Sequence, residues 1–259
     1  MNNSTFKNIL AIDTASSLLS VALQAGNDQL YFEADAQGSH SQILLDIVDY
    51  LTKNASIKPH ELSLVLCMKG PGSFTGLRIG FASAKGLALA LGIPFHPISS
   101  LDCMSHPFSV WPGIVMPVID AKKNAYFYAF YYLGRRLCQD MDTGLSGIKA
   151  QIEKIPDFQN NKLEHKILLT GPDAQKLQGE LEKYPEFCEN ITYCLAPGFR
   201  FGCARELLAI AMEKEIKTGK EWEPATWARR EIPEDFLASP DYIRKSDAEL
   251  NSEKMCKNV

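Results

Sequence analysis

The chain contains 259 residues, 46% of them hydrophobic and 22% charged, and its formal net charge is −4. These proportions are typical of a globular protein with enough apolar residues for a sizeable core. The acidic balance excludes a strongly basic surface that binds nucleic acid without a partner. The sequence has neither the roughly 18-residue apolar run that crosses a bilayer nor a signal peptide, which predicts a cytoplasmic location and no membrane partner. Seven scattered cysteines favour reduced thiols over a disulfide framework.

The first predicted elements form a meander of three strands. Residues 9–15 read Ile-Leu-Ala-Ile-Asp-Thr-Ala, which is typical of a buried strand that ends at a carboxylate, Asp13. Residues 18–25 and 30–36 alternate in polarity as two further strands do.

A helix is predicted over residues 39–53, opened by a capping box in which Gln42 follows Ser39 by three residues. One face is expected to point into the core and a second to lie on the flank of the helix. The core face comprises Leu44, Val48 and Leu51, and the flank comprises Ile43, Ile47 and Tyr50.

A short strand at residues 62–68 leads into a glycine-rich turn and a helix of small residues over 76–91. Each helical glycine costs about 1 kcal/mol relative to alanine, so close packing against the core, another helix or another chain is predicted. The small residues recur every four positions along one helix face, namely Gly76, Gly80, Ala84 and Ala88.

The second half of the chain partly repeats the first. Residues 115–121 echo 9–15, because both are apolar strands that end in Asp-Thr-Ala or Asp-Ala. An internal duplication is therefore predicted, with a boundary near 95–110 that separates subdomains 1–100 and 101–259. The tail after Trp222 is expected to be irregular. The other predicted elements are strands at 125–133, 136–141 and 166–170 and helices at 145–154, 173–183 and 200–217.

A phosphate or nucleotide site is one interpretation of the strand end and the glycine-rich turn. Exposed amides and the helix dipole favour an anion, and the carboxylate could hold Mg²⁺ through water. The alternative is a tight strand-to-helix connection that needs glycine, and the turn matches neither the dinucleotide fingerprint nor a P-loop. Both interpretations stay open for the residues concerned, namely Asp13, Thr14, Gly72, Ser73 and Thr75.

The sequence gives little indication of a metal site or of a catalytic nucleophile. The five histidines form no His-x-x-x-His pair, so no metal site is predicted, and Cys67 is expected in the core. No catalytic residue is assigned, because Ser73 and Thr75 lack a neighbouring base.

The two N-terminal helices together predict an apolar patch, which on a soluble protein marks an interface, although burial under the second half is the alternative. Gly80→Arg is expected to abolish partner binding and to leave the fold largely intact. The predicted interface residues are His40, Ile43, Ile47, Tyr50, Gly76, Arg78, Ile79, Gly80 and Ala84.

Several motifs resemble one known family. They are Ala-Ile-Asp-Thr-Ala-Ser at 11–16, Gly-Pro-Gly-Ser-Phe-Thr-Gly-Leu-Arg-Ile-Gly at 70–80, Val-Ile-Asp-Ala at 118–121 and Pro-Asp-Tyr-Ile-Arg at 240–244. In this order they resemble the TsaB (YeaZ) family of bacterial tRNA threonylcarbamoyladenosine synthesis. The resemblance implies a duplicated actin-like, hexokinase-like (ASKHA) α/β fold, in which each subdomain has a mixed sheet and flanking helices.

The resemblance also implies an accessory subunit rather than an enzyme. In this family the paralogue TsaD modifies adenosine 37 of ANN-decoding tRNAs, and TsaB binds TsaD through its two N-terminal helices, or forms a homodimer when alone. The ATPase TsaE is an expected third partner, tRNA is contacted only through the complex, and no cofactor is bound tightly, although ATP or ADP could sit at the partner interface. Lys122, Lys123 and Ala125 depart from the family pattern. The alternative function is a small-molecule kinase or ATPase of the same fold.

Overall fold

The computed structural model describes residues 7–155, 166–185, 191–196, 202–218 and 238–240. Its first sheet has the strand order β3-β2-β1-β4-β5, with the central strand antiparallel to β2 and parallel to β4. The strands are β1 (Asn8–Asp13), β2 (Leu18–Ala25), β3 (Asp28–Asp35), β4 (Leu64–Gly70) and β5 (Phe95–Ser99).

The second sheet repeats this plan around β6. Its main path is β10-β7-β6-β11-β12, in which β6 pairs antiparallel with β7 and parallel with β11, and β8 and β9 extend it at one end of β6. The prediction of a duplicated fold is therefore confirmed. The strands are β6 (Ile114–Lys122), β7 (Ala125–Tyr128), β8 (Tyr131–Tyr132), β9 (Arg135–Arg136), β10 (Met141–Thr143), β11 (Lys166–Thr170) and β12 (Thr192–Leu195).

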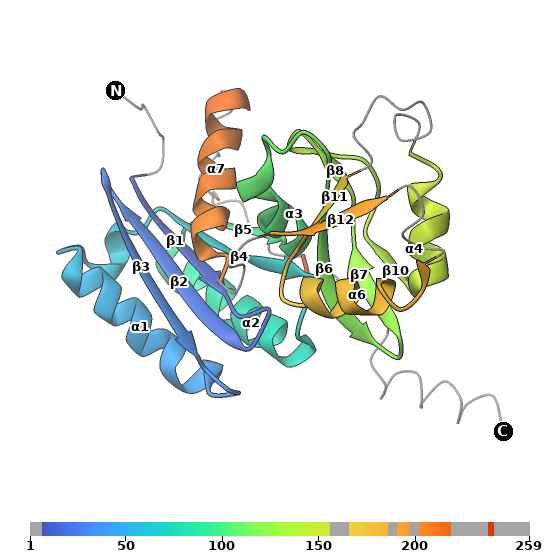
Figure 1. The fold of residues 1–259 in the computed structure, drawn as a ribbon. Helices are drawn as coiled ribbons and strands as arrows, with labels where there is room; N and C mark the ends of the chain where they lie inside the picture. Colours follow the sequence, from blue (N-terminus) through green and yellow to red (C-terminus); the bar gives the residue numbers. More distant parts are fainter. Residues whose placement is uncertain (1–6, 156–165, 186–190, 197–201, 219–237, 241–259) are drawn as a thin grey trace, which may run out of the picture.

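The helices occupy corresponding places in the two halves (Figure 1). The pair α1 and α2 covers the outer face of the first sheet, and α4 and α6 cover the outer face of the second. The pair α3 and α7 lies between the two sheets, where α7 contacts β1, β2 and β4. The helices are α1 (His40–Asn54), α2 (Phe74–Leu91), α3 (Ser100–Ser105), α4 (Leu145–Ile152), α6 (Ala174–Leu181) and α7 (Ala204–Thr218), with 3₁₀ turns η1 (Pro59–Glu61) and η2 (His106–Phe108).

Alternation along the strands assigns side chains to separate cores. In β1, Ile9 and Ala11 face the core around α3 and α7, whereas Leu10 and Ile12 face the core under α1 and α2. Successive strand residues point to opposite faces, so a continuous apolar run is required where both faces are covered. Cys67 lies in the core as predicted and is 1% exposed.

Several predicted elements are corrected. The capping box is not formed, because the Ser39 side chain caps no amide of α1. The strand predicted at 125–133 divides into β7 and β8, because the amide of Phe130 turns to the Cys138 sulfur, 3.3 Å away, instead of the ladder. The segment 136–141 is not one strand. The sequence analysis also missed β5, α3 and β12.

Other predictions are only partly covered by the structure. The tail after Trp222 lies outside the described residues except for 238–240, as does most of the motif at 240–244. The boundary between 1–100 and 101–259 stays a prediction, although α7 packs on the first sheet. Within the described residues, no helix combines the length and the apolarity that a membrane crossing requires.

Candidate functional site

The end of β1 and the start of α2 form a tight connection. Thr14 donates a hydrogen bond from its hydroxyl to the carbonyl of Gly76 over 2.7 Å, and the amide of Ser73 donates to the carbonyl of Ala15 over 2.7 Å. A Cβ at Gly72 would lie 2.6 Å from the Ala15 oxygen, and a Cβ at Gly76 would overlap the Thr14 carbonyl oxygen. Glycine is therefore required here for close backbone approach, which favours the tight-connection interpretation.

The predicted phosphate-site residues do not converge on an open site. Asp13 is 3% exposed, and its two carboxylate oxygens accept hydrogen bonds from the amides of Ala15 (2.8 Å) and Cys203 (2.7 Å). Burial raises the pKa of the Asp13 carboxyl, and these two hydrogen bonds oppose that rise. Ser73 caps α2 by accepting from the amide of Gly76, and it is exposed with Thr75. Nucleotide binding by these residues stays a prediction.

The second half carries Asp120 at the equivalent strand end, with different chemistry. Burial works to raise the pKa of Asp120, but hydrogen bonds from Lys176 and Lys122 outweigh it and bring the pKa to about 2. The side chains of both lysines lie 3.0 Å from one carboxylate oxygen, and Asp173 accepts the Asp120 amide over 2.7 Å. The two strand-end carboxylates are therefore bound by groups of this chain. Among the described residues, no three His, Cys, Asp or Glu side chains are placed to hold a metal ion.

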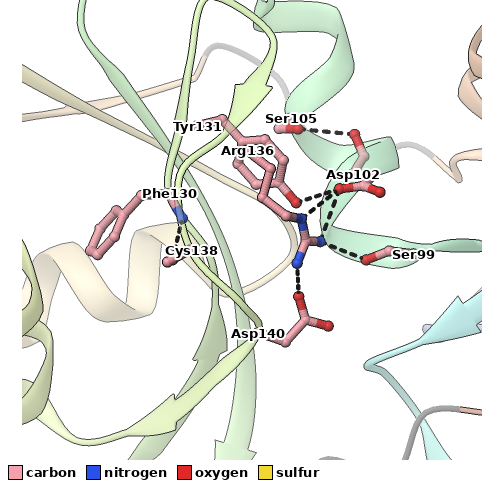
Figure 2. A network of polar contacts seen from close by, with 8 residues as sticks. All are labelled: Ser99, Asp102, Ser105, Phe130, Tyr131, Arg136, Cys138 and Asp140. Carbon is pink, nitrogen blue, oxygen red and sulfur yellow. Dashed lines mark hydrogen bonds and ion pairs between the residues drawn. The ribbon is translucent and has the colours of Figure 1, made fainter. Parts of the chain in front are cut away.

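The junction between the halves contains a further polar cluster (Figure 2). Arg136 lies between Asp102 of α3 and Asp140, and its guanidinium also reaches the Ser99 hydroxyl at 3.0 Å. Asp102 accepts from the Tyr131 hydroxyl over 2.7 Å, and burial together with the charge of Asp102 raises the pKa of that tyrosine. With 29% of its side chain exposed, Arg136 fixes α3 to the β9–β10 segment, which is a structural role.

The predicted partner surface on α1 and α2 needs correction, because five of its nine residues are buried. Gly80 and Ala84 are buried with Gly76, and a Cβ at Gly80 would overlap the Thr14 hydroxyl. The prediction that Gly80→Arg leaves the fold largely intact is therefore wrong on steric grounds. Ile47 is 6% exposed and belongs to the core. Ile43 and Ile79 are half-buried, whereas Tyr50 and Arg78 are exposed as predicted.

His40 also lies inside the protein rather than on the surface. It is the first residue of α1 and is only 5% exposed, and its Nε2 has no hydrogen-bond partner among the described residues. The His40 side chain therefore cannot be part of a contact surface.

Besides Tyr50, the outer faces of these helices carry two exposed apolar residues that the sequence analysis missed, Leu45 and Leu89. Leu45 is 59% exposed, Tyr50 is 57% exposed and Leu89 is 50% exposed. A second stripe of residues, spaced by four and facing solvent, runs along α2: Arg78, Ala82, Gly86 and Ala90. A Cβ at Gly86 would meet nothing within 4 Å, so packing within the described chain does not require this glycine. The spacing of four residues in this exposed stripe is visible in the sequence. The buried stripe at 76, 80, 84 and 88 has the same spacing, so the sequence alone does not show which of the two faces solvent.

Comparisons with known proteins agree with this architecture. Residues 34–181 match the family model described as TsaD: tRNA N6-adenosine threonylcarbamoyltransferase. A solved structure from Pseudomonas aeruginosa, described as an uncharacterized protein with similarity to peptidase YEAZ, superposes with a TM-score of 0.68 at 23% identity, over 92% of this chain and 100% of that one. This chain thus shares the duplicated α/β fold of that protein.

Sequence relatives narrow this class to one family. The Bacillus subtilis tRNA threonylcarbamoyladenosine biosynthesis protein TsaB is 33% identical over 124 residues, which cover 48% of this chain and 54% of that protein. The protein of the same name from Buchnera aphidicola subsp. Schizaphis graminum is 30% identical over 176 residues, covering 66% of this chain and 81% of that protein. The chain belongs to the TsaB family. It spans about half the length of the first curated relatives that it matches.

Proposed function

We propose that this chain is a non-catalytic subunit that binds a TsaD paralogue and supports threonylcarbamoyl transfer to adenosine 37 of ANN-decoding tRNAs. Family membership supports the pathway, because the relatives are named for tRNA threonylcarbamoyladenosine biosynthesis. A TsaE ATPase as third partner, a homodimer of the isolated chain and a cytoplasmic location belong to the same proposal. So do contact with tRNA only through the complex and ATP or ADP at the partner interface.

The observation that carries the proposal is the outer face of α1 and α2. Leu45, Tyr50 and Leu89 are each at least half exposed, and Gly86 leaves open space on the same face of α2 as Leu89. Gly86 costs about 1 kcal/mol of helix stability relative to alanine. Exposed apolar side chains and open space at a helical glycine suit the close approach of another chain. We assign the TsaD paralogue to it because the resemblance places that contact on these two helices.

The strand-end carboxylates support the non-catalytic part of the proposal. Both oxygens of Asp13 accept amides of this chain, and Asp120 is paired with Lys122 and Lys176. A kinase or ATPase needs carboxylates that can reach a metal-bound phosphate. Calorimetric titration of the isolated chain with millimolar Mg-ATP tests this point, and binding heat together with ATP turnover would favour the alternative function.

The test of partner binding uses two glycines in equivalent helices. Gly86→Arg places a long side chain on the outer face of α2, and Gly179→Arg does the same on α6, where a Cβ also meets nothing within 4 Å. Arginine is a better helix former than glycine, so both variants should stay folded. We expect Gly86→Arg to weaken binding to the TsaD paralogue of the same organism at least tenfold, and Gly179→Arg to bind like the wild type.

The functional readout is threonylcarbamoyl transfer by TsaD to tRNA, measured with and without this chain. We expect transfer to require the chain, to fail with Gly86→Arg and to be normal with Gly179→Arg. Normal binding and transfer with Gly86→Arg would show that the interface is misplaced. Full TsaD activity without this chain would contradict the proposed function itself.

A further inference from the structure

Residues 238–240 lie against helix α2 of the first half, far from their own place in the sequence. The ammonium of Lys85 on α2 donates a hydrogen bond to the carbonyl oxygen of Ala238, 153 residues further along the chain. Ala238 also packs against the apolar core under α1 and α2, and Ser239 next to it is exposed. This segment is therefore fastened to the first half by one polar contact and one apolar contact.

Two aromatic rings fix the position of the Lys85 side chain. Its Nζ lies 5.6 Å from the centre of the Phe81 ring and 5.9 Å from the centre of the Phe95 ring, and the two rings meet edge to face. Phe95 begins β5, which is the edge strand of the first sheet. A lysine stem packs on apolar rings, and the rings attract its ammonium. The half-buried Lys85 thus holds Ala238 at the corner between α2 and β5.

The contact with Ala238 borders the outer face of α2. Lys85 follows Ala82 by three residues and precedes Leu89 by four, so the three residues share one side of the helix. Ala82 and Leu89 are exposed, whereas Lys85 is half-buried between them and the core. Leu89 lies one turn beyond Lys85, about 6 Å along the helix axis. A chain that covers Leu89 therefore also meets the segment that Lys85 holds.

We propose that residues 238–240, fastened by Lys85, form part of the surface that binds the TsaD paralogue. This inference rests on the proposed function, and it adds a late segment of the chain to an interface otherwise built from α1 and α2. A partner seated on Leu89 encloses the hydrogen bond between Lys85 and Ala238, and the bond is stronger once water is excluded. Fastening of the segment and binding of the partner therefore stabilise each other by the same factor.

Chemical labelling of the segment tests whether the partner covers it. Ser239→Cys places a thiol at an exposed position, and Gln175→Cys does so on the exposed side of α6 as a control. Each full-length variant reacts with a maleimide at a concentration at which the isolated chain is monomeric, and mass spectrometry of the labelled peptide separates the new thiol from the native ones. We expect saturating TsaD to slow the labelling of Ser239→Cys about tenfold or more and to leave that of Gln175→Cys unchanged.

Removal of the Lys85 ammonium tests the fastening. Lys85→Met keeps a long apolar side chain beside Phe81 and Phe95 but donates no hydrogen bond, and we expect it to bind TsaD roughly fivefold less tightly. Lys85→Arg retains a cationic donor and should bind nearly as well as the wild type. Lys154→Met removes an exposed lysine just after α4 and should leave the affinity unchanged.

Ser239→Arg decides the matter if Lys85→Met does not fold, because its new side chain extends from an exposed position. We expect it to bind TsaD roughly tenfold less tightly. Equal labelling of Ser239→Cys with and without bound TsaD would overturn this inference, as would wild-type affinity of Ser239→Arg or of folded Lys85→Met. In each of these cases, binding of the wild-type chain to TsaD would leave the proposed function standing. A wild-type chain that does not bind TsaD would overturn both.

Discussion

Two glycines of α2 should respond in opposite directions to the same substitution. Gly76 lies against the Thr14 backbone, where a Cβ would overlap the carbonyl oxygen and lie 3.1 Å from the carbonyl carbon. Gly86 lies on the outer face, where a Cβ meets nothing within 4 Å. We predict that Gly76→Ala destabilises the protein and that Gly86→Ala stabilises it.

The magnitudes follow from the contacts. Forcing a methyl group into the packed site at Gly76 costs about 1–3 kcal/mol, and separation of Thr14 from the Gly76 carbonyl loses a buried hydrogen bond worth about 1–3 kcal/mol. The better helix propensity of alanine returns about 1 kcal/mol, which leaves a net loss of roughly 3 kcal/mol. At Gly86 only the propensity gain operates, so the free energy of unfolding should rise by about 0.5–1 kcal/mol.

Equilibrium unfolding in urea, followed by circular dichroism, measures both changes. The midpoint should fall for Gly76→Ala and rise for Gly86→Ala at similar m-values. Gly86→Ala should bind the TsaD paralogue less tightly than the wild type despite its higher stability, since the methyl group occupies the open space. A Gly76→Ala variant as stable as the wild type would refute the steric argument, and a destabilised Gly86→Ala variant would refute the assignment of an open face.

Further predictions concern the two half-buried charged clusters. Arg136→Met should lower the free energy of unfolding by about 2 kcal/mol in urea titrations, because Asp102 and Asp140 lose the cation that both contact. An unchanged midpoint would show that the cluster in Figure 2 adds no stability. The folded-state pKa of Asp120 is lowered to about 2, so its contribution to stability is present above the unfolded pKa of about 4 and is lost as pH falls from there toward 2. Asp120→Asn should therefore be about 1 kcal/mol less stable than the wild type near neutral pH, with a smaller difference in high salt, and equal to it only once the pH has fallen through about 2. A constant difference across this range would contradict the ionised pair with Lys122 and Lys176.

The sequence was sufficient for the overall architecture. Apolar runs with alternation predicted β1 to β3, and the echo of residues 9–15 in 115–121 predicted the second copy of the same plan. These patterns are local, because successive side chains of a strand point to opposite faces, so neighbouring residues alone show which face is buried. The sequence analysis did not predict the edge strand β5, because Pro94 and Pro97 interrupt its apolar pattern. It also did not predict β12, which has only four residues and therefore too short a pattern to recognise.

Only the tertiary structure decided what the candidate residues do. Small residues spaced by four occur on two faces of α2, at 76, 80 and 84 and at 82, 86 and 90, and periodicity ranks neither above the other. Gly76 and Gly80 lie against Thr14 and Ala84 lies in the core, so the first set is buried, whereas the second set is exposed. Likewise, the sequence places Asp13 at a strand end, but its partner is an amide 190 residues further along the chain. Such pairings depend on how the two halves close on each other, and no local pattern encodes that arrangement.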